Sequence, residues 1–149
     1  MRWRIDKDTR TDRGASAVEF ALVVIPLLMI IAGIVNFGFA FAQQLALDNS
    51  VRAGARAGVV DRGTAAPTPL TVATDQWNST AIARSLTDPI TVVHDGGVGS
   101  TCKGSAFGGR MVVKGTVKSK FLVPWPLPSS VVPSSVTLTS KAEFQCEYQ

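Results

Sequence analysis

A long apolar run dominates the pattern of hydrophobic and polar positions along the chain. No charged residue occurs from Phe20 to Ala42, and a helix needs ~20 apolar residues to cross the hydrocarbon core of a membrane. Pro26 lies inside this run and predicts a kink. Helical patterning continues past Ala42 to a breaker at Asp61, so the sequence predicts one helix over residues 15–60. Its second half must project from the membrane, because the whole helix is more than twice as long as the hydrocarbon core is thick.

The remaining pattern predicts a small α+β domain. Residues 61–74 are rich in Pro and Thr and predict a linker, and residues 75–149 form the domain. Its predicted elements are a short helix from Asp75 to Thr87, ended by Asp88-Pro89, and a strand from Ile90 to His94. Two later segments alternate strictly and predict an antiparallel sheet with one face on a helix. Their inward positions are Met111, Val113, Gly115, Val117, Ser119 and Phe121, and then Val136, Leu138, Ala142, Phe144, Cys146 and Tyr148.

A proline-rich connection joins these two strands. Pro124-Trp125-Pro126-Leu127-Pro128 is stiff and cannot be helical. Two interpretations of Trp125 stay open: it covers the small core of the domain, or it is a contact aromatic for a partner.

The distribution of charged residues predicts the orientation of the chain in the membrane. Residues 1–14 are polar and aperiodic, and they carry five basic residues against three acidic ones. Basic residues next to the first apolar segment favour a cytoplasmic N-terminus. The sequence therefore predicts a cytoplasmic leader over residues 1–14, disordered or loosely associated with the membrane, and a single-pass protein of the cell membrane. The domain at residues 75–149 is then extracytoplasmic.

The two cysteines fit that topology. Cys102 and Cys146 both lie in the predicted outer domain, where an oxidising compartment favours a disulfide. We expect them to pair, because Cys146 falls on the inward face of the last strand.

One short motif at the start of the apolar run carries a family resemblance. Gly14-Ala-Ser-Ala-Val-Glu19 precedes the run, Gln43-Gln44 follows it, and Asn49-Ser-Val-Arg52-Ala-Gly-Ala-Arg56 ends the helix. Together these segments resemble the TadE family, the minor pseudopilins of the tight-adherence (Flp) branch of type IV pilus systems. The resemblance covers residues 13–60, and residues 52–56 are its more diagnostic part.

The resemblance implies roles for three residues. A prepilin peptidase would cleave after Gly14 and leave Ala15 as a free α-amine. Glu19, the fifth residue of the mature chain, would pair with the α-amine of a neighbouring subunit during assembly. A local interpretation of Glu19 also stands, because Ser16 and Glu19 match the spacing of a helix capping box. The implied partners are membrane lipid, other pilin or pseudopilin subunits, and the peptidase.

Candidate chemistry elsewhere is sparse. The single histidine has no partners for a metal or nucleophile site, and the basic residues form no nucleic-acid-binding helix. We expect no enzyme activity, catalytic residue, metal, cofactor, small-molecule substrate or nucleic acid. Two rival functions remain. In the first, the chain would be a permanently anchored binding protein. In the second, it would be a binding domain secreted after cleavage at Ala40-Phe41-Ala42.

Overall fold

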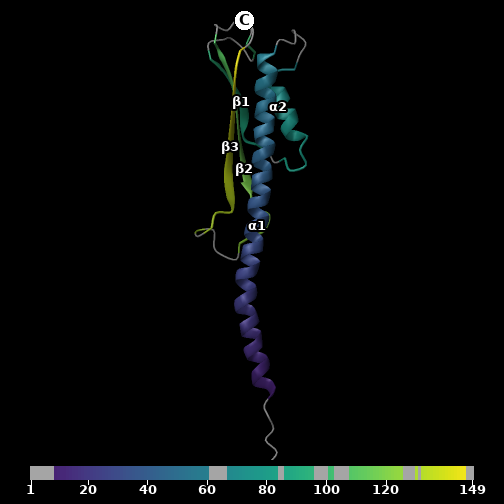
Figure 1. The fold of residues 1–149 in the computed structure, drawn as a ribbon, viewed down its shortest axis with the longest axis vertical. Helices are drawn as coiled ribbons and strands as arrows, with labels where there is room; N and C mark the ends of the chain where they lie inside the picture. The colour runs from purple at the N-terminus through teal and green to yellow at the C-terminus, as the bar shows by residue number, and fades with distance from the viewer. Residues whose placement is uncertain are drawn as a thin grey trace, which may run out of the picture.

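The structure, a computed structural model, describes residues 9–60, 67–83, 86–95, 101–102, 108–125, 130 and 132–146; for residues 9–13, 86–89 and 92–95 it describes the backbone only. It contains one long helix, one short helix and a three-stranded sheet, so the predicted α+β class is confirmed (Figure 1). The elements in chain order are α1 (Thr9–Val59), α2 (Pro69–Asn78), β1 (Leu86–Asp95), β2 (Arg110–Lys120) and β3 (Ser135–Gln145).

Helix α1 is the axis of the molecule. It runs without interruption for 51 residues and continues through Pro26. It begins at Thr9 rather than at residue 15, so residues 9–14 of the predicted leader are helical and not disordered. Residues 1–8 lie outside the described part. The helix extends far below the domain as an isolated rod (Figure 1).

The sheet is an antiparallel meander in the order β1-β2-β3. Strand β2 is central, and its residues are alternately buried and exposed. The pairing of Val113 with both Val92 and Ala142 fixes the register on its two sides. Five of the six inward positions predicted for this segment are confirmed, because Met111, Val113, Gly115, Val117 and Ser119 are all buried; the sixth, Phe121, follows the end of β2 and is half-buried.

The upper half of α1 lies between the sheet and α2, which makes three layers (Figure 1). Leu47, Val51 and Ala55 of α1 are fully buried in the centre. Trp77 of α2 and Met111 of β2 pack against them in the same core cluster. The domain therefore folds around the upper half of the same helix that carries the apolar run, and the two cannot be separated without exposing this core.

Two glycines allow the layers to approach closely. A Cβ atom at Gly54 would lie 2.7 Å from the carbonyl oxygen of Pro69 and 2.7 Å from the Cβ atom of Ala73. On the opposite side of α1, a Cβ atom at Gly115 of β2 would lie 2.9 Å from Leu47. Only glycine fits at these distances without displacing a neighbour.

Two predicted elements were wrong in position. The short helix begins at Pro69, inside the predicted linker, because Thr68 caps it and proline is favoured in the first turn of a helix. Asp88-Pro89 lies within β1 instead of ending a helix. The sheet tolerates Pro89 because β1 is an edge strand, and its register is irregular between Asp88 and Thr91.

Candidate membrane and assembly surface

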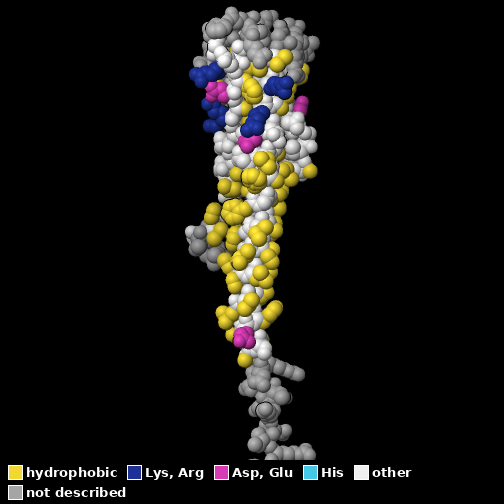
Figure 2. All heavy atoms as spheres, in the orientation of Figure 1, with side chains coloured by type: hydrophobic (Ala, Val, Ile, Leu, Met, Phe, Trp, Pro, Cys, Tyr) yellow, Lys and Arg dark blue, Asp and Glu magenta, His cyan; other side chains and the backbone are white. Residues whose placement is uncertain are grey.

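The lower half of α1 exposes its apolar side chains on all sides. Among the described helices, α1 is the one long and apolar enough to cross a membrane, and only 6% of its most apolar window is buried. A core helix of a soluble domain would be mostly buried. Figure 2 shows hydrophobic side chains covering this rod, whereas charged side chains gather higher on the domain. The exposed apolar residues below the domain include Val18, Phe20, Leu22, Val23, Ile25, Leu27, Leu28 and Ile30.

Gly14, Ala15 and Glu19 lie near the lower end of this rod. All three are helical and exposed, and a Cβ atom at Gly14 would meet no other atom within 4 Å. Because α1 begins at Thr9, Ser16 lies inside the helix and is not its N-cap residue. The capping box of Ser16 and Glu19 is therefore wrong for the chain before cleavage.

The apolar surface also continues upward beside the domain. Ile30, Ile34, Phe37, Phe41 and Leu45 are exposed and spaced by three or four residues, so they share one face of α1. We call these five residues the outer stripe. The domain buries a different set at similar heights, which consists of Ala32, Asn36, Ala40, Gln43 and Leu47. The domain thus occupies one face of the helix, and the outer stripe is open except at Phe37, whose ring lies 6.2 Å from that of Phe121.

Amide side chains attach the domain to the occupied face. Asn36 Nδ2 donates to the carbonyl oxygen of Val123 at 2.9 Å, and the N–H of Val123 donates to Asn36 Oδ1 at 2.9 Å. Two turns higher, Gln43 Nε2 donates to the carbonyl oxygen of Ile82 at 2.9 Å. Sequence reasoning missed these contacts, although a polar residue inside an apolar run was a usable signal, since buried polar groups need partners.

The motif at the top of α1 divides into packing and exposed positions. Gly54 and Ala55 are buried against α2 and the sheet, whereas Arg52 and Arg56 are exposed. Asp48 accepts a hydrogen bond from Gln44 at 3.0 Å. Asp48, Arg52 and Arg56 follow one another at intervals of four residues, so they lie on one side of the helix. The small residues of the motif therefore have a folding role.

The outer face of the sheet carries a small ion-pair cluster. Glu143 lies 2.6 Å from Arg110 and 3.1 Å from Lys141. The hydrogen bond from Lys141, followed by that from Arg110, lowers the pKa of Glu143 below its ordinary value. The group is exposed to solvent, so this cluster contributes little to stability. No cluster of three metal-ligating side chains occurs among the residues that the structure describes.

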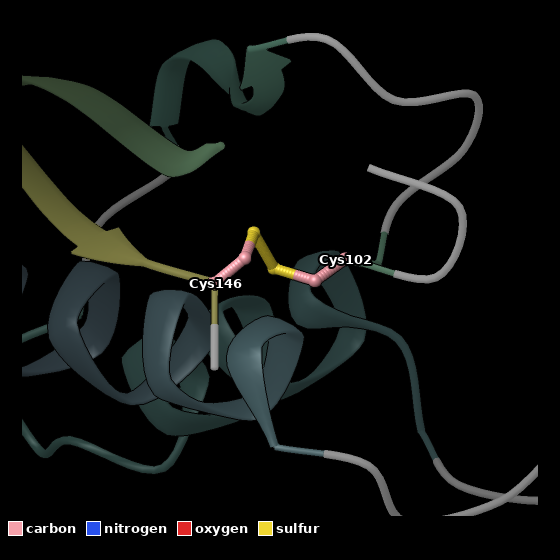
Figure 3. Close-up of a disulfide and its surroundings, with 2 residues drawn as sticks. All are labelled: Cys102 and Cys146. Carbon is pink, nitrogen blue, oxygen red and sulfur yellow. A yellow bond between two sulfur atoms is a disulfide. The ribbon is translucent and has the colours of Figure 1, made fainter. Parts of the chain in front are cut away.

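The predicted disulfide is present between Cys102 and Cys146, with the two Cα atoms 5.6 Å apart. Cys146 directly follows β3, and its sulfur reaches Cys102 beside the upper ends of the helices (Figure 3). The N–H of Cys102 also donates to the carbonyl oxygen of Gly58 at 3.1 Å. The disulfide and this hydrogen bond together connect the end of the sheet, through Cys102, to the end of α1.

Comparison with known proteins identifies one segment of the chain. The family model described as TadE-like protein matches residues 14–56. No curated protein and no solved structure matches the chain. The matched segment contains the exposed rod, the outer stripe and the motif that packs α2. Residues 14–56 are therefore a TadE-like segment, which confirms the resemblance predicted from the sequence.

Proposed function

We propose that this chain is a minor pseudopilin, processed by a prepilin peptidase and packed into a pilus assembly through α1. The TadE-like segment and the long exposed apolar helix fit a membrane protein associated with the tight-adherence pilus. The proposed role is structural and needs no catalytic residue.

The observation that carries the proposal is the length of the exposed apolar surface. From Val18 to Leu45 this surface extends ~40 Å along the helix, whereas the hydrocarbon core is ~30 Å thick. Lipid therefore cannot cover both ends at once unless the helix tilts strongly, and the domain packed beside its upper half opposes such a tilt. The upper part of the outer stripe, at Phe41 and Leu45, requires cover from protein, and another apolar helix has the matching shape and chemistry.

Glu19 supplies a specific contact for such a neighbour. It is exposed among Val18, Phe20 and Leu22, where an unpaired carboxylate is costly in lipid. Cleavage after Gly14 would create an α-amine at Ala15, one helical turn from Glu19. The proposed pair joins Glu19 of one subunit to the Ala15 amine of the next, which neutralises both charges.

Gly14 suits the cleavage position for two physical reasons. It presents no side chain to obstruct a peptidase, and glycine weakens a helix by ~0.5–1 kcal/mol relative to alanine. Because α1 begins at Thr9, the peptide bond between Gly14 and Ala15 lies within helical backbone. The glycine lowers the cost of opening the helix there.

The proposed topology has a cytoplasmic N-terminus and an extracytoplasmic domain. The basic residues of the first fourteen positions support the first part. The disulfide supports the second, because disulfides persist in oxidising compartments.

The secreted alternative is disfavoured by the packing of Ala40. Cleavage after Ala42 would remove Asn36 and Ala40, both buried in the folded chain, and would expose the domain surface that they cover. A permanently anchored binding protein remains the competing candidate, and it would keep its leader.

Intact mass of the membrane-extracted protein tests processing. The proposal predicts a chain that begins at Ala15. Retention of residues 1–14 would support the permanently anchored alternative, and a start at Gln43 would support the secreted one.

Photocrosslinking tests the packing face. A photoreactive phenylalanine analogue at Phe41 should link to the apolar helix of another pilin-type subunit in cells that assemble the pilus. The same analogue at Lys114, exposed on the outer face of β2, is the matched control and should not. Equal crosslinking at both positions would contradict packing through the outer stripe.

A further inference from the structure

The connection between β2 and β3 reaches down α1 to the height of the apolar rod (Figure 1). We call the first part of this connection, residues 121–125, the basal loop. The ring of Phe121 lies 6.2 Å from that of Phe37, and Val123 pairs with Asn36. Below them, a Cβ atom at Gly33 would lie 3.5 Å from the indole ring of Trp125. Trp125 therefore packs on the helix and does not cover the core of the domain.

The length of α1 fixes the depth of the basal loop in a membrane. About 20 helical residues span the hydrocarbon core. Counted from Ala15 they end near Val35, and counted from Phe20, the first residue after Glu19, they end near Phe39. The loop contacts helix residues 33–37, so either count brings it to the membrane boundary on the side of the domain.

The surface of the basal loop matches that boundary in chemistry. Leu122 leaves 47% of its surface exposed, and Pro124 is exposed beside Trp125. Lys118 and Lys120, the exposed basic residues at the end of β2, directly precede the loop, and lysine side chains extend toward phosphate headgroups. Apolar loop residues that face the acyl chains, with lysines above them at the level of the headgroups, are the arrangement expected at a membrane interface.

Below the loop lies an apolar groove of about 380 Å³ between the loop and the helix. It is lined by Ile25, Leu28, Met29, Ile31, Ala32, Val123 and Pro124. The groove is continuous with the exposed rod that the proposed function places in lipid. Its lining has no charged group, so its ligand must be apolar.

We infer that the basal loop is a second membrane contact of this chain. Leu122, Pro124 and Trp125 insert into the leaflet on the side of the domain, and acyl chains of that leaflet fill the groove. The inference rests on the proposed membrane insertion of α1. It means that two elements, and not the helix alone, set the height of the domain above the bilayer.

Depth-dependent quenching tests this inference in the full-length protein reconstituted in phospholipid vesicles. Single cysteines are introduced by Leu122→Cys, Val23→Cys and Gln76→Cys and labelled with an environment-sensitive fluorophore, with the native disulfide left oxidised. Val23 is the reference inside the bilayer, and Gln76, exposed on α2, is the reference in water. Lipids with spin labels at shallow or deep acyl positions act as quenchers.

The inference predicts that the label at position 122 is quenched several-fold more than that at position 76, and most strongly by the shallow quencher. Quenching at position 23 without quenching at position 122 would overturn the membrane contact of the loop and leave membrane insertion of α1 intact. A label at position 122 that neither the spin-labelled lipids nor iodide added to the buffer can quench would also overturn it, because protein, and not lipid, would then cover the loop. Absence of quenching at position 23 would overturn membrane insertion itself.

Discussion

Asn36 on α1 and Val123 in the basal loop form a pair of reciprocal hydrogen bonds across 87 positions of sequence, each 2.9 Å long. The side-chain amide of Asn36 satisfies both backbone groups of Val123, as a neighbouring strand would. Asn36 is almost completely buried, so water cannot replace these bonds. This pair fixes the basal loop at one height on the helix.

Replacement of Asn36 by leucine should release the basal loop. Asn36→Leu keeps a side chain of similar size but leaves the N–H and C=O of Val123 without hydrogen-bond partners. Each unpaired group destabilises the attached position of the loop by about 1–3 kcal/mol. We expect faster hydrogen exchange at the Val123 amide, measured in detergent. Asn49→Leu, at an exposed position of the same helix, is the control and should leave that exchange unchanged. Equal exchange in both variants would mean that Asn36 does not hold the loop.

Gly54→Ala should weaken the packing of α2 on α1. The new Cβ atom would meet the backbone oxygen of Pro69 at 2.7 Å, and backbone cannot rotate away as a side chain can. We expect a loss of about 1–3 kcal/mol in the free energy of unfolding, measured by urea denaturation in detergent. At Gly38 a Cβ atom meets nothing within 4 Å, so Gly38→Ala should instead stabilise by about 0.5–1 kcal/mol. Similar effects at the two glycines would refute the close-approach explanation.

The disulfide should contribute a large part of the stability of the domain. It closes a loop with a sequence separation of 44, for which the chain-entropy model gives about 4 kcal/mol. We expect the double variant Cys102→Ala/Cys146→Ala to lose an amount of this order in urea denaturation. A direct chemical check is alkylation of the denatured protein with and without prior reduction. Equal masses after the two treatments would show that no such bond is present.

The sequence predicted the elements correctly where a single local pattern, such as alternation or an apolar run, determines the structure. Alternation in β2 reflects one buried and one exposed face, so Met111 and Val113 could be placed without knowing their neighbours. The helix that contains the apolar run could likewise be predicted from its own residues, without knowledge of what packs against it. The small residues at Gly54 and Ala55 were also identifiable as a packing face.

Prediction failed where two signals competed. Thr68-Pro69 was interpreted as linker, although a capping threonine followed by proline is also a helix start. Pro89 was interpreted as a helix stop, but an edge strand accepts it. The position of the basal loop could not be predicted, because the pairing of Asn36 with Val123 depends on how the domain folds back along the helix. Nothing local to either residue indicates the other.

Glu19 is central to the proposed assembly. Removal of its carboxylate should make membrane insertion easier, because an acidic residue in an apolar helix opposes insertion. It should at the same time leave the Ala15 amine of a neighbouring subunit without a partner. Insertion and assembly are therefore expected to respond in opposite directions to the same substitution.

Pilus yield, measured beside membrane abundance and leader removal for Glu19→Ala and Glu19→Gln, is the most direct test of that role. The glutamine substitution keeps the size and hydrogen-bonding capacity of the side chain and removes only its charge. We predict that both variants accumulate in the membrane, lose residues 1–14 normally and fail to support pili. Normal pili with Glu19→Gln would contradict the charge pairing between Glu19 and Ala15.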